Sequence, residues 1–303
     1  MNTLASGISF IDLNFQDTGR IIASGILQGP EGVAIVDPGP SSALPALRRG
    51  LEAAGLSTLD LTALALTHIH LDHAGATGTL VAENPRLRVY VHELGAPHLV
   101  DPSKLLASAA RLYGDTMDKL WGEVRAVPSS AIVPLAGGER VELADRPWEV
   151  TYTPGHASHH VSYFNQDTGL AFVGDTAGVK LLPNGPVIPP TPPPDINLEV
   201  WRESLTRIES WAPKTLFLTH FGTAGDPGPH LAELREALDW TASLAKASLA
   251  RDEDDQAREA WFVEEMRRRV RRHLDAAAGG TYDLAARFDL CWRGLARYWR
   301  KKL

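Results

Sequence analysis

The segment THIHLDH places four potential metal ligands within six positions. It directly follows an apolar run, residues 61–66, that is typical of a buried strand. In extended backbone the side chains of His68 and His70 project to one face, while Asp72 and His73 follow in the turn where the backbone reverses. Imidazole and carboxylate ligands suit zinc, iron or manganese, and no thiolate stands nearby. The sequence therefore predicts a strand that ends at a metal centre.

Three further candidate ligands stand where other apolar runs end in polar or glycine-containing turns. His156 ends the segment TPGH, Asp175 lies in VGDT, and His220 lies in LTHFG. Each preceding run is typical of a strand, so these side chains belong to strand ends. Together with the first cluster they supply enough ligands for two metal ions.

In this order the residues resemble the metallo-β-lactamase-fold hydrolases, in which an HxHxDH motif is followed by a later His, Asp and His. The resemblance covers roughly residues 20–225, and all seven motif positions are filled. It implies two ligand sets with a shared carboxylate: one metal ion held by His68, His70 and His156, a second held by Asp72, His73 and His220, and both bridged by Asp175.

The same resemblance implies an α/β fold, namely a four-layered αββα sandwich of the metallo-β-lactamase type with the site at one edge between two sheets. An internal repeat supports two related halves. The run GVAIVD, ending at Asp37, resembles GLAFVGD, ending at Asp175. Likewise LALTH, ending at His68, resembles LFLTH, ending at His220. A duplicated strand, helix and strand unit places these pairs at corresponding strand ends.

The implied activity is hydrolysis of an ester, thioester or lactone by a hydroxide that bridges two divalent ions. Zinc is favoured, with iron or manganese as alternatives. Metal binding lowers the pKa of water from 15.7 to about 7 and so makes hydroxide available at neutral pH. Asp72 is the candidate to orient the nucleophile and to pass a proton to the leaving group. Asp175 is the second predicted catalytic carboxylate. The substrate is expected to be a small molecule.

Hydroxyacylglutathione hydrolases, which belong to the same superfamily, commonly carry a basic turn with the sequence GCG after the bridging aspartate. Residues 176–180 read TAGVK and lack that turn, which argues against a glutathione thioester. Lys180 is a candidate to meet an anionic substrate, and a solvent-exposed lysine is the equal alternative.

Two other functions stay open. A persulfide-dioxygenase-like oxidoreductase shares the motifs but uses one iron, held by His68, His156 and Asp175, and consumes oxygen. A nucleic-acid phosphodiesterase of the same fold would rely on the arginines among residues 267–272. The net charge of −7 and the acidic residues that alternate with these arginines favour a salt-bridged surface instead. Nucleic acid is therefore not expected as a partner.

Near residue 229 the strand-like runs end and helical patterns begin, and this change predicts the domain organisation. With 303 residues, of which 44% are hydrophobic, the chain can form a large domain with an appendage. We expect a catalytic domain over residues 1–228 and a helical carboxy-terminal domain over residues 229–303. Its third helix is expected to be capped by Thr281, after a break at Gly279 and Gly280.

No apolar run approaches the roughly 20 residues that a membrane span needs, and no signal sequence opens the chain. We therefore expect a cytoplasmic protein with no membrane partner. The single Cys291 excludes an intrachain disulfide and is expected in a core. A homodimer stays open.

The remaining histidines divide into two kinds. His159 stands where the family commonly has glycine and could point into the site, whereas the resemblance makes His160 a buried structural residue. The others are expected to have structural roles only: His92, His98, His230 and His273. In the family, the residue equivalent to Asp37 steadies the histidine loop without binding metal.

Several segments outside the ligands shape the expected cleft. Residues 182–195 contain seven prolines and must form a loop, either a cleft wall or a stiff connector. Residues 102–124 suggest a helical insertion, and residues 197–211 a helix on the sheet. Ser41 or Ser42 is expected to cap an earlier helix. We expect the proline-rich loop and the carboxy-terminal helices to form walls without taking part in chemistry.

Overall fold

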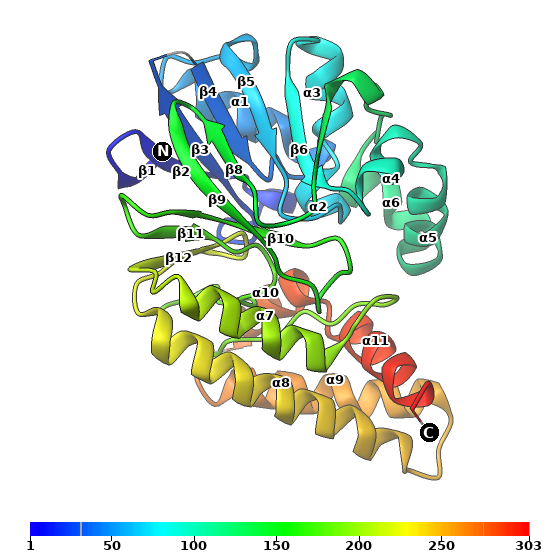
Figure 1. Ribbon diagram of the computed structural model, residues 1–303. Helices are drawn as coiled ribbons and strands as arrows, with labels where there is room; N and C mark the ends of the chain where they lie inside the picture. The colour runs from blue at the N-terminus through cyan, green and yellow to red at the C-terminus, as the bar shows by residue number, and fades with distance from the viewer. Residues whose placement is uncertain (31, 275, 303) are drawn as a thin grey trace.

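The computed structural model describes residues 1–30, 32–274 and 276–302. Figure 1 shows two facing sheets with helices on both outer sides, which confirms the four-layered αββα sandwich. One sheet has seven strands in the order β1-β2-β3-β4-β5-β6-β7, and the other has six in the order β13-β12-β11-β10-β9-β8. The carboxy-terminal helices extend from the lower side of the second sheet in this view (Figure 1).

The strands of the first sheet are β1 (Asn2–Ala5), β2 (Ile8–Asp12), β3 (Ala23–Gly29), β4 (Gly32–Val36), β5 (Leu61–Ala65), β6 (Arg88–His92) and β7 (Ile132–Leu135). Those of the second sheet are β8 (Arg140–Leu143), β9 (Arg146–Tyr152), β10 (Val161–Asn165), β11 (Leu170–Phe172), β12 (Thr215–Leu218) and β13 (Gly222–Ala224). The helices before the proline-rich loop are α1 (Leu44–Glu52), α2 (Leu71–Ala74), α3 (Thr77–Glu83), α4 (Ala96–Val100), α5 (Ser103–Tyr113) and α6 (Met117–Trp121). Those after it are α7 (Leu198–Ser210), α8 (Pro227–Leu249), α9 (Asp255–Arg271), α10 (Ala276–Ala286) and α11 (Phe288–Arg300).

Two pairs of parallel strands carry the predicted ligands to one edge of the sandwich. β4 pairs with β5 in the first sheet, and β11 pairs with β12 in the second. The carboxyl ends of parallel strands lie at the same edge of a sheet, so the segments that follow them meet. Backbone hydrogen bonds join the sheets there, because the Val161 N–H donates to the Thr67 carbonyl and the Ala23 N–H to the Thr219 carbonyl, both at 2.8 Å. The internal repeat is thus confirmed as two equivalent strand pairs.

Helix α7 confirms the prediction made for residues 197–211. The Asn197 side chain accepts a hydrogen bond from the Val200 N–H at 3.2 Å, which satisfies one free donor of the first turn. The Trp201 indole N–H donates to the Thr176 carbonyl at 2.7 Å, so the helix holds the loop that follows Asp175. The buried face consists of residues at helical spacing: Leu198, Trp201, Leu205 and Ile208.

Two local predictions are wrong. Neither Ser41 nor Ser42 caps α1; their hydroxyls instead donate to the carbonyls of Gly75 and Leu120, which ties this segment to α2 and α6. The three-dimensional partners of these hydroxyls lie far along the chain, so no local pattern could identify them.

The expected break at Gly279 and Gly280 is also wrong, because α10 runs through both glycines and Thr281 lies inside it. The helix ends instead before Arg287, which has a left-handed φ of 47°. Each glycine costs about 1 kcal/mol in a helix interior. Tertiary packing offsets this cost, since the Tyr282 side chain is fully buried and its hydroxyl accepts a hydrogen bond from the Leu181 N–H at 3.1 Å.

The carboxy-terminal helices share the core of the two sheets. One contiguous cluster of buried apolar side chains extends from Ile8 in β2 to Tyr298 in α11. The Trp292 indole N–H donates to the Ser248 hydroxyl at 2.7 Å and joins α11 to α8. The domain boundary at residue 228 stays a prediction; α8 itself begins at Pro227.

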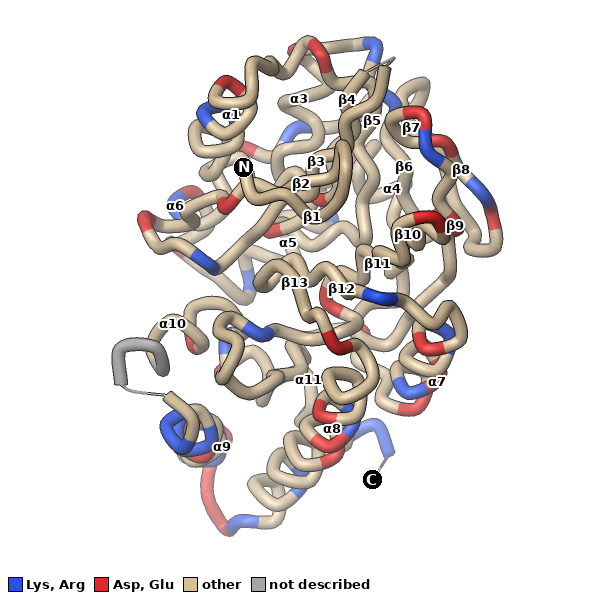
Figure 2. The backbone as a smooth tube through the Cα atoms, turned by 90° about the vertical axis from the view of Figure 1, so that its left-hand side faces the viewer, with Lys and Arg blue, Asp and Glu red and all other residues tan. Residues whose placement is uncertain are grey.

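The arginine-rich face of α9 is salt-bridged, as predicted. Figure 2 shows both basic and acidic residues on this helix. Three arginines have acidic partners: Arg267 with Asp283, Arg268 with Glu265, and Arg271 with Glu264. Among the described residues, no helix combines the length and apolar character that crossing a membrane requires.

The proline-rich loop packs directly on α11. The Thr191 N–H donates to the Cys291 sulfur at 3.4 Å, and the Thr191 hydroxyl donates to the Cys291 carbonyl at 3.2 Å. The Cys291 side chain is fully buried, as expected. Gly294 approaches so closely that a Cβ placed on it would lie 2.0 Å from the Thr191 carbonyl oxygen. The helix and the loop therefore form one rigid contact.

We expect Gly294→Ala to destabilise the protein by about 1–3 kcal/mol, because the added methyl group overlaps backbone atoms that cannot rotate away. The matched control is Gly280→Ala in α10, where nothing lies within 4 Å of the added Cβ, and this change should stabilise by up to about 1 kcal/mol. Urea unfolding of both variants measures the difference. Equal stabilities would refute the close contact between α11 and the loop.

Candidate metal centre

All seven predicted ligands lie together at the edge between the sheets. His68 and His70 precede α2. Asp72 and His73 lie within this helix of four residues rather than in an irregular turn. The other three follow the ends of β9, β11 and β12: His156, Asp175 and His220. They form three overlapping groups whose ligand atoms lie within 4.8 Å of one another: His68 with His70 and His156; His68 with His73 and Asp175; Asp72 with His73 and His220.

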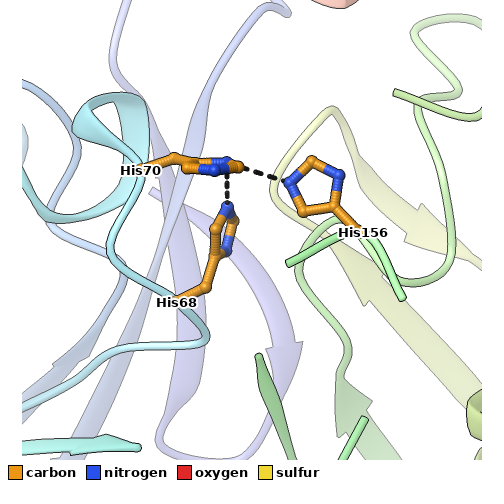
Figure 3. Close-up of side chains that lie close together, drawn as sticks. All are labelled: His68, His70 and His156. Carbon is orange, nitrogen blue, oxygen red and sulfur yellow. Dashed lines mark hydrogen bonds between the residues drawn. The ribbon is translucent and has the colours of Figure 1, made fainter. Parts of the chain in front are cut away.

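The first group consists of three converging imidazoles, shown in Figure 3. His70 Nδ1 lies 3.0 Å from His68 Nε2 and 3.0 Å from His156 Nε2. His70 Nδ1 either carries one proton or has one lone pair, so it cannot form a hydrogen bond with both neighbouring nitrogens at once. Three nitrogens around a tetrahedral zinc ion lie about 3.3 Å apart, so this spacing suits a shared cation.

The second group places one carboxylate between two imidazoles. Asp72 Oδ2 lies 3.3 Å from His220 Nε2 and 3.8 Å from His73 Nε2. Asp175 stands between the groups: its Oδ1 lies 3.3 Å from His73 Nε2, and its Oδ2 lies 3.4 Å from His156 Nε2. The two oxygens of a single carboxylate therefore face different ligand groups.

Several of these atoms are buried without a hydrogen-bond partner among the described residues: His73 Nε2, His220 Nε2 and Asp175 Oδ1. Leaving a buried polar atom unpaired costs about 1–3 kcal/mol, so three neighbouring cases require a common explanation. Asp175 Oδ1 lies 3.3 Å from His73 Nε2 and 3.6 Å from His220 Nε2, so the three atoms converge on one point. A divalent cation bound by all three removes the cost, and the residues present fit such an ion.

The outer ring nitrogens determine which atom each histidine presents to the centre. His156 Nδ1 lies 2.8 Å from the Pro190 carbonyl, and His220 Nδ1 lies 2.6 Å from the Ile21 carbonyl. Because a carbonyl can only accept, both Nδ1 atoms carry the proton and both Nε2 atoms present a lone pair inward. This orientation of a ligand by an outer hydrogen bond is typical of metal-binding histidines.

The turn before His156 depends on Gly155. This glycine has φ of +136°, and an added Cβ would lie 2.4 Å from the Trp201 Cα in α7. Only a residue without a side chain permits such a close approach. The contact sets the position of His156 opposite His70.

Asp37 is fully buried behind the ligands and joins three segments. Its Oδ1 accepts from the Thr67 N–H at 2.8 Å. Its Oδ2 accepts from the hydroxyls of Thr67 at 2.8 Å and Thr219 at 2.9 Å, and lies 2.8 Å from His73 Nδ1. The predicted supporting position of Asp37 is confirmed, and Thr219 adds a link to the second sheet that the sequence did not indicate.

The two groups differ in their electrostatics. Burial, together with the neighbouring His156, lowers the pKa of His70 to about 3. Burial opposes ionisation of Asp72, but His73 and His220 outweigh it and lower the pKa of Asp72 to about 2. Burial likewise disfavours the charged form of His73, yet the carboxylates of Asp175 and Asp72 raise its pKa well above the usual value. The first group thus presents neutral imidazoles, whereas a cation at the second group displaces protons.

The histidines outside the seven positions mostly confirm their predicted roles. His160 is fully buried, with Nδ1 2.9 Å from the Thr153 hydroxyl. His159 lines the cavity above the centre, beside His70, and belongs to none of the ligand groups found among the described residues. His92 and His230 are buried, and His273 is exposed. His98 lines the cavity, and its purely structural role stays a prediction.

A cavity of about 340 Å³ opens above the ligands. Its walls come from the α5–α6 insertion, the proline-rich loop and the junction of α10 and α11. The loop is therefore a cleft wall, the first of its two predicted roles. Lys180 does not line this cavity, and its ammonium pairs with Glu233 at 3.2 Å, so the structure does not support the suggested contact with an anionic substrate.

Two facing sheets with a cluster of His and Asp at their shared edge define an αββα metalloprotein. A family model described as the metallo-beta-lactamase superfamily matches residues 17–220. The chain belongs to this superfamily of metal-dependent hydrolases.

Similar proteins agree with this assignment. ST1585 from Sulfurisphaera tokodaii, a metallo-beta-lactamase fold-containing protein, is 31% identical over 201 residues, covering 65% of this chain and 71% of that protein. A hydroxyacylglutathione hydrolase from Hahella chejuensis is 33% identical over 153 residues, covering 50% of this chain and 45% of that enzyme. The chain thus spans about half the length of the hydroxyacylglutathione hydrolases that it matches.

Solved structures show the same fold. TTHA1429 from Thermus thermophilus, a metallo-beta-lactamase family protein, has a TM-score of 0.73 and 23% identity, covering 99% of this chain and 95% of that chain. TTHA1623, solved in a di-iron-bound form, has a TM-score of 0.51 and 27% identity, covering 67% of this chain and 89% of that chain.

We expect the protein to bind two divalent ions per chain, because two ligand groups share the Asp175 carboxylate. His220→Ala should retain one ion, since it removes a ligand from the second group only. His273→Ala, at an exposed position, is the matched control and should retain two. Elemental analysis after dialysis against zinc, manganese or iron gives the stoichiometry. Saturation of the unaltered protein at one ion would contradict the expectation.

We expect Asp37→Asn to weaken metal retention by about 10- to 100-fold, because the amide cannot accept all four of the bonds made by the carboxylate. Competition with a chelator measures retention directly. Asp167→Asn, in an exposed turn, is the control and should leave it unchanged. Unaltered metal affinity in a folded Asp37→Asn protein would show that the carboxylate does not orient the ligands.

Proposed function

We propose that the protein is a binuclear metal-dependent hydrolase of an ester, thioester or lactone, with zinc as the favoured metal. The observation that carries the proposal is the position of Asp175, whose two oxygens face two separate ligand groups at the base of one cavity. One ion would be held by His68, His70 and His156, and the other by Asp72, His73 and His220, with Asp175 shared between them.

Two bound divalent ions would supply Lewis acidity and a water of lowered pKa at neutral pH. The protein holds the ligands for this chemistry by its own contacts. The carbonyls of Pro190 and Ile21 keep two Nε2 atoms directed inward, and Asp37 holds His73. These fixed orientations supply the preorganisation that catalysis requires.

Asp72 is the carboxylate placed to move a proton. Its side chain is 23% exposed and lines the cavity, whereas that of Asp175 is 5% exposed. Its lowered pKa keeps it ionised at neutral pH, so it can accept a hydrogen bond from the attacking water and then take up the proton that this water releases as it adds to the carbonyl group. It can then pass that proton to the leaving oxygen or sulfur.

The similar proteins indicate the type of bond that is cleaved more closely than the identity of the substrate. Hydroxyacylglutathione hydrolases match about half of the chain, which supports an ester or thioester bond. Residues 176–180 lack the basic turn of those enzymes, and Lys180 is paired with Glu233 away from the cavity. A glutathione thioester is therefore not the proposed substrate. Iron remains an alternative metal, since TTHA1623 was solved with two irons.

A substrate panel on metal-loaded protein tests the proposal. We expect hydrolysis of activated esters, thioesters or lactones at rates at least about 100-fold above those for phosphodiesters and β-lactams. Asp72→Asn should lower kcat by about 100-fold or more, through loss of the proton acceptor and of a ligand. Oxygen uptake with a persulfide substrate, with a single bound iron, would instead identify a dioxygenase. Hydrolysis of phosphodiesters alone would also overturn the proposal.

A further inference from the structure

We propose that the cavity above the metal centre binds an uncharged aliphatic acyl chain. This inference rests on the proposed function and deepens it by naming the substrate class. The substrate would be an aliphatic acyl ester, thioester or lactone. Water adds to the carbonyl carbon, the C–O or C–S bond breaks, and the products are a carboxylic acid and an alcohol or thiol that takes up the proton.

The cavity has a continuous aromatic side. Phe15 stacks on Trp121 at a centroid distance of 5.8 Å, and Tyr113 meets Trp121 edge-on at 4.9 Å. The guanidinium of Arg287 lies over the Tyr113 ring at 5.3 Å and connects this side to the start of α11. All four residues line the cavity. An aliphatic chain suits such a surface because its burial removes apolar area from water on both partners.

Aliphatic side chains complete the cavity. They come from segments that are distant in sequence: Ile22 after the first hairpin, Leu71 in α2, Leu105 and Leu112 in α5, and Leu284 and Leu290 near the α10–α11 junction. Apolar groups on opposite sides enclose a volume of about 340 Å³. Pockets of roughly 300–1,000 Å³ hold small organic ligands, so the space suits a chain of modest length.

The charges around the cavity do not form an anion site. The Arg287 side chain is occupied by Asp289, with hydrogen bonds of 3.0 and 2.8 Å. Asp195 accepts from the Ser158 hydroxyl at 2.6 Å and adds negative charge on the opposite side. Among the described lining residues, Lys104 alone is a cation without an ion-pair partner, and it is exposed. Away from the candidate metal ligands, phosphate or multiple carboxylate groups would therefore lack the paired cations that recognise them.

The cavity lies directly over the candidate ligands, so an acyl chain bound in it would lie next to the reacting atoms. His70, Asp72, His156, Asp175 and His220 lie among its lining residues, and the aromatic and aliphatic walls surround them. A carbonyl group held over the ligands can thus leave its hydrocarbon chain between α5 and the α10–α11 junction. Binding energy from the chain would hold the carbonyl in place for attack.

A chain-length series tests the inference. Acetyl, butyryl, hexanoyl and octanoyl esters of one leaving alcohol are compared on the zinc-loaded protein. Because burying each methylene contributes about 0.8 kcal/mol, kcat/KM should rise about fourfold per methylene until the cavity is filled. A flat series, or faster hydrolysis of an anionic glutathione thioester than of the octanoyl ester, would overturn the inference.

Two substitutions on α5 form a matched pair. Ala109 is buried and lines the cavity, whereas the adjacent Ala110 is exposed and does not. Ala109→Leu should fill part of the space and lower the octanoyl-to-acetyl ratio of kcat/KM by at least about tenfold. Ala110→Leu should leave both activities unchanged. Equal ratios in the two variants, at equal metal content, would count against the cavity as the acyl site.

A binding measurement separates this inference from the proposed function. Calorimetry with methyl alkyl ketones of increasing length reports on the cavity without requiring hydrolysis. We expect affinity to rise with chain length in the unaltered protein and less steeply in Ala109→Leu. Ketone binding without hydrolysis of any ester, thioester or lactone would refute the proposed function alone. Hydrolysis of the acetyl ester without any dependence of rate or affinity on chain length would refute the acyl site alone.

Discussion

The arrangement of the site depends on the hydrogen bonds of the Asp37 carboxylate. A buried charge is costly unless it is paired and fully hydrogen-bonded, and Asp37 has four partners within 3 Å. Those partners come from the loop after β5, from α2 and from the loop after β12. The same contacts that satisfy the charge therefore hold the two sheets in register and direct His73 toward the centre. The left-handed backbone at Asp37, with φ of 53°, brings the carboxylate into this position.

A second set of supports acts from outside the sandwich. His156 depends on the Pro190 carbonyl, and the loop that carries Pro190 is held by Thr191 against α11. The carboxy-terminal helices thus support a candidate ligand as well as forming a cavity wall. The expectation that the loop and these helices form walls without taking part in chemistry stays a prediction, and to the walls the structure adds this support of a ligand. A backbone carbonyl from the proline-rich loop contacts the ring of a ligand, and close packing against Gly294 keeps it there.

The candidate ligands and the walls of the cavity have separate structural origins. The seven candidate ligands belong to the strand ends and to α2, which the superfamily fold brings together. The cavity walls come from the α5–α6 insertion, the proline-rich loop and the α10–α11 junction. Strand ends are held on both sides by sheet hydrogen bonds and can hold ligands accurately, whereas insertions can change without disturbing them. This separation explains why the ligand set indicates a reaction class and the walls indicate a substrate class.

The sequence by itself determined the seven candidate ligands and the duplicated strand pairs, because each rests on a local motif at the end of an apolar run. The αββα fold followed from the family resemblance that these motifs carry. It also indicated α7 and the salt-bridged face of α9, where helical periodicity is strong. It could not identify Thr219, Pro190 and Ile21 as supports, because hydroxyls and backbone carbonyls occur throughout the chain and carry no motif.

Only the tertiary structure decided that Gly279 and Gly280 continue a helix, that Lys180 pairs with Glu233, and that the ends of α5 and α10 face one cavity. The physical reason is common to these cases. Each outcome depends on contacts between segments about 50 to 180 residues apart, and such contacts can outweigh local propensity by a few kcal/mol.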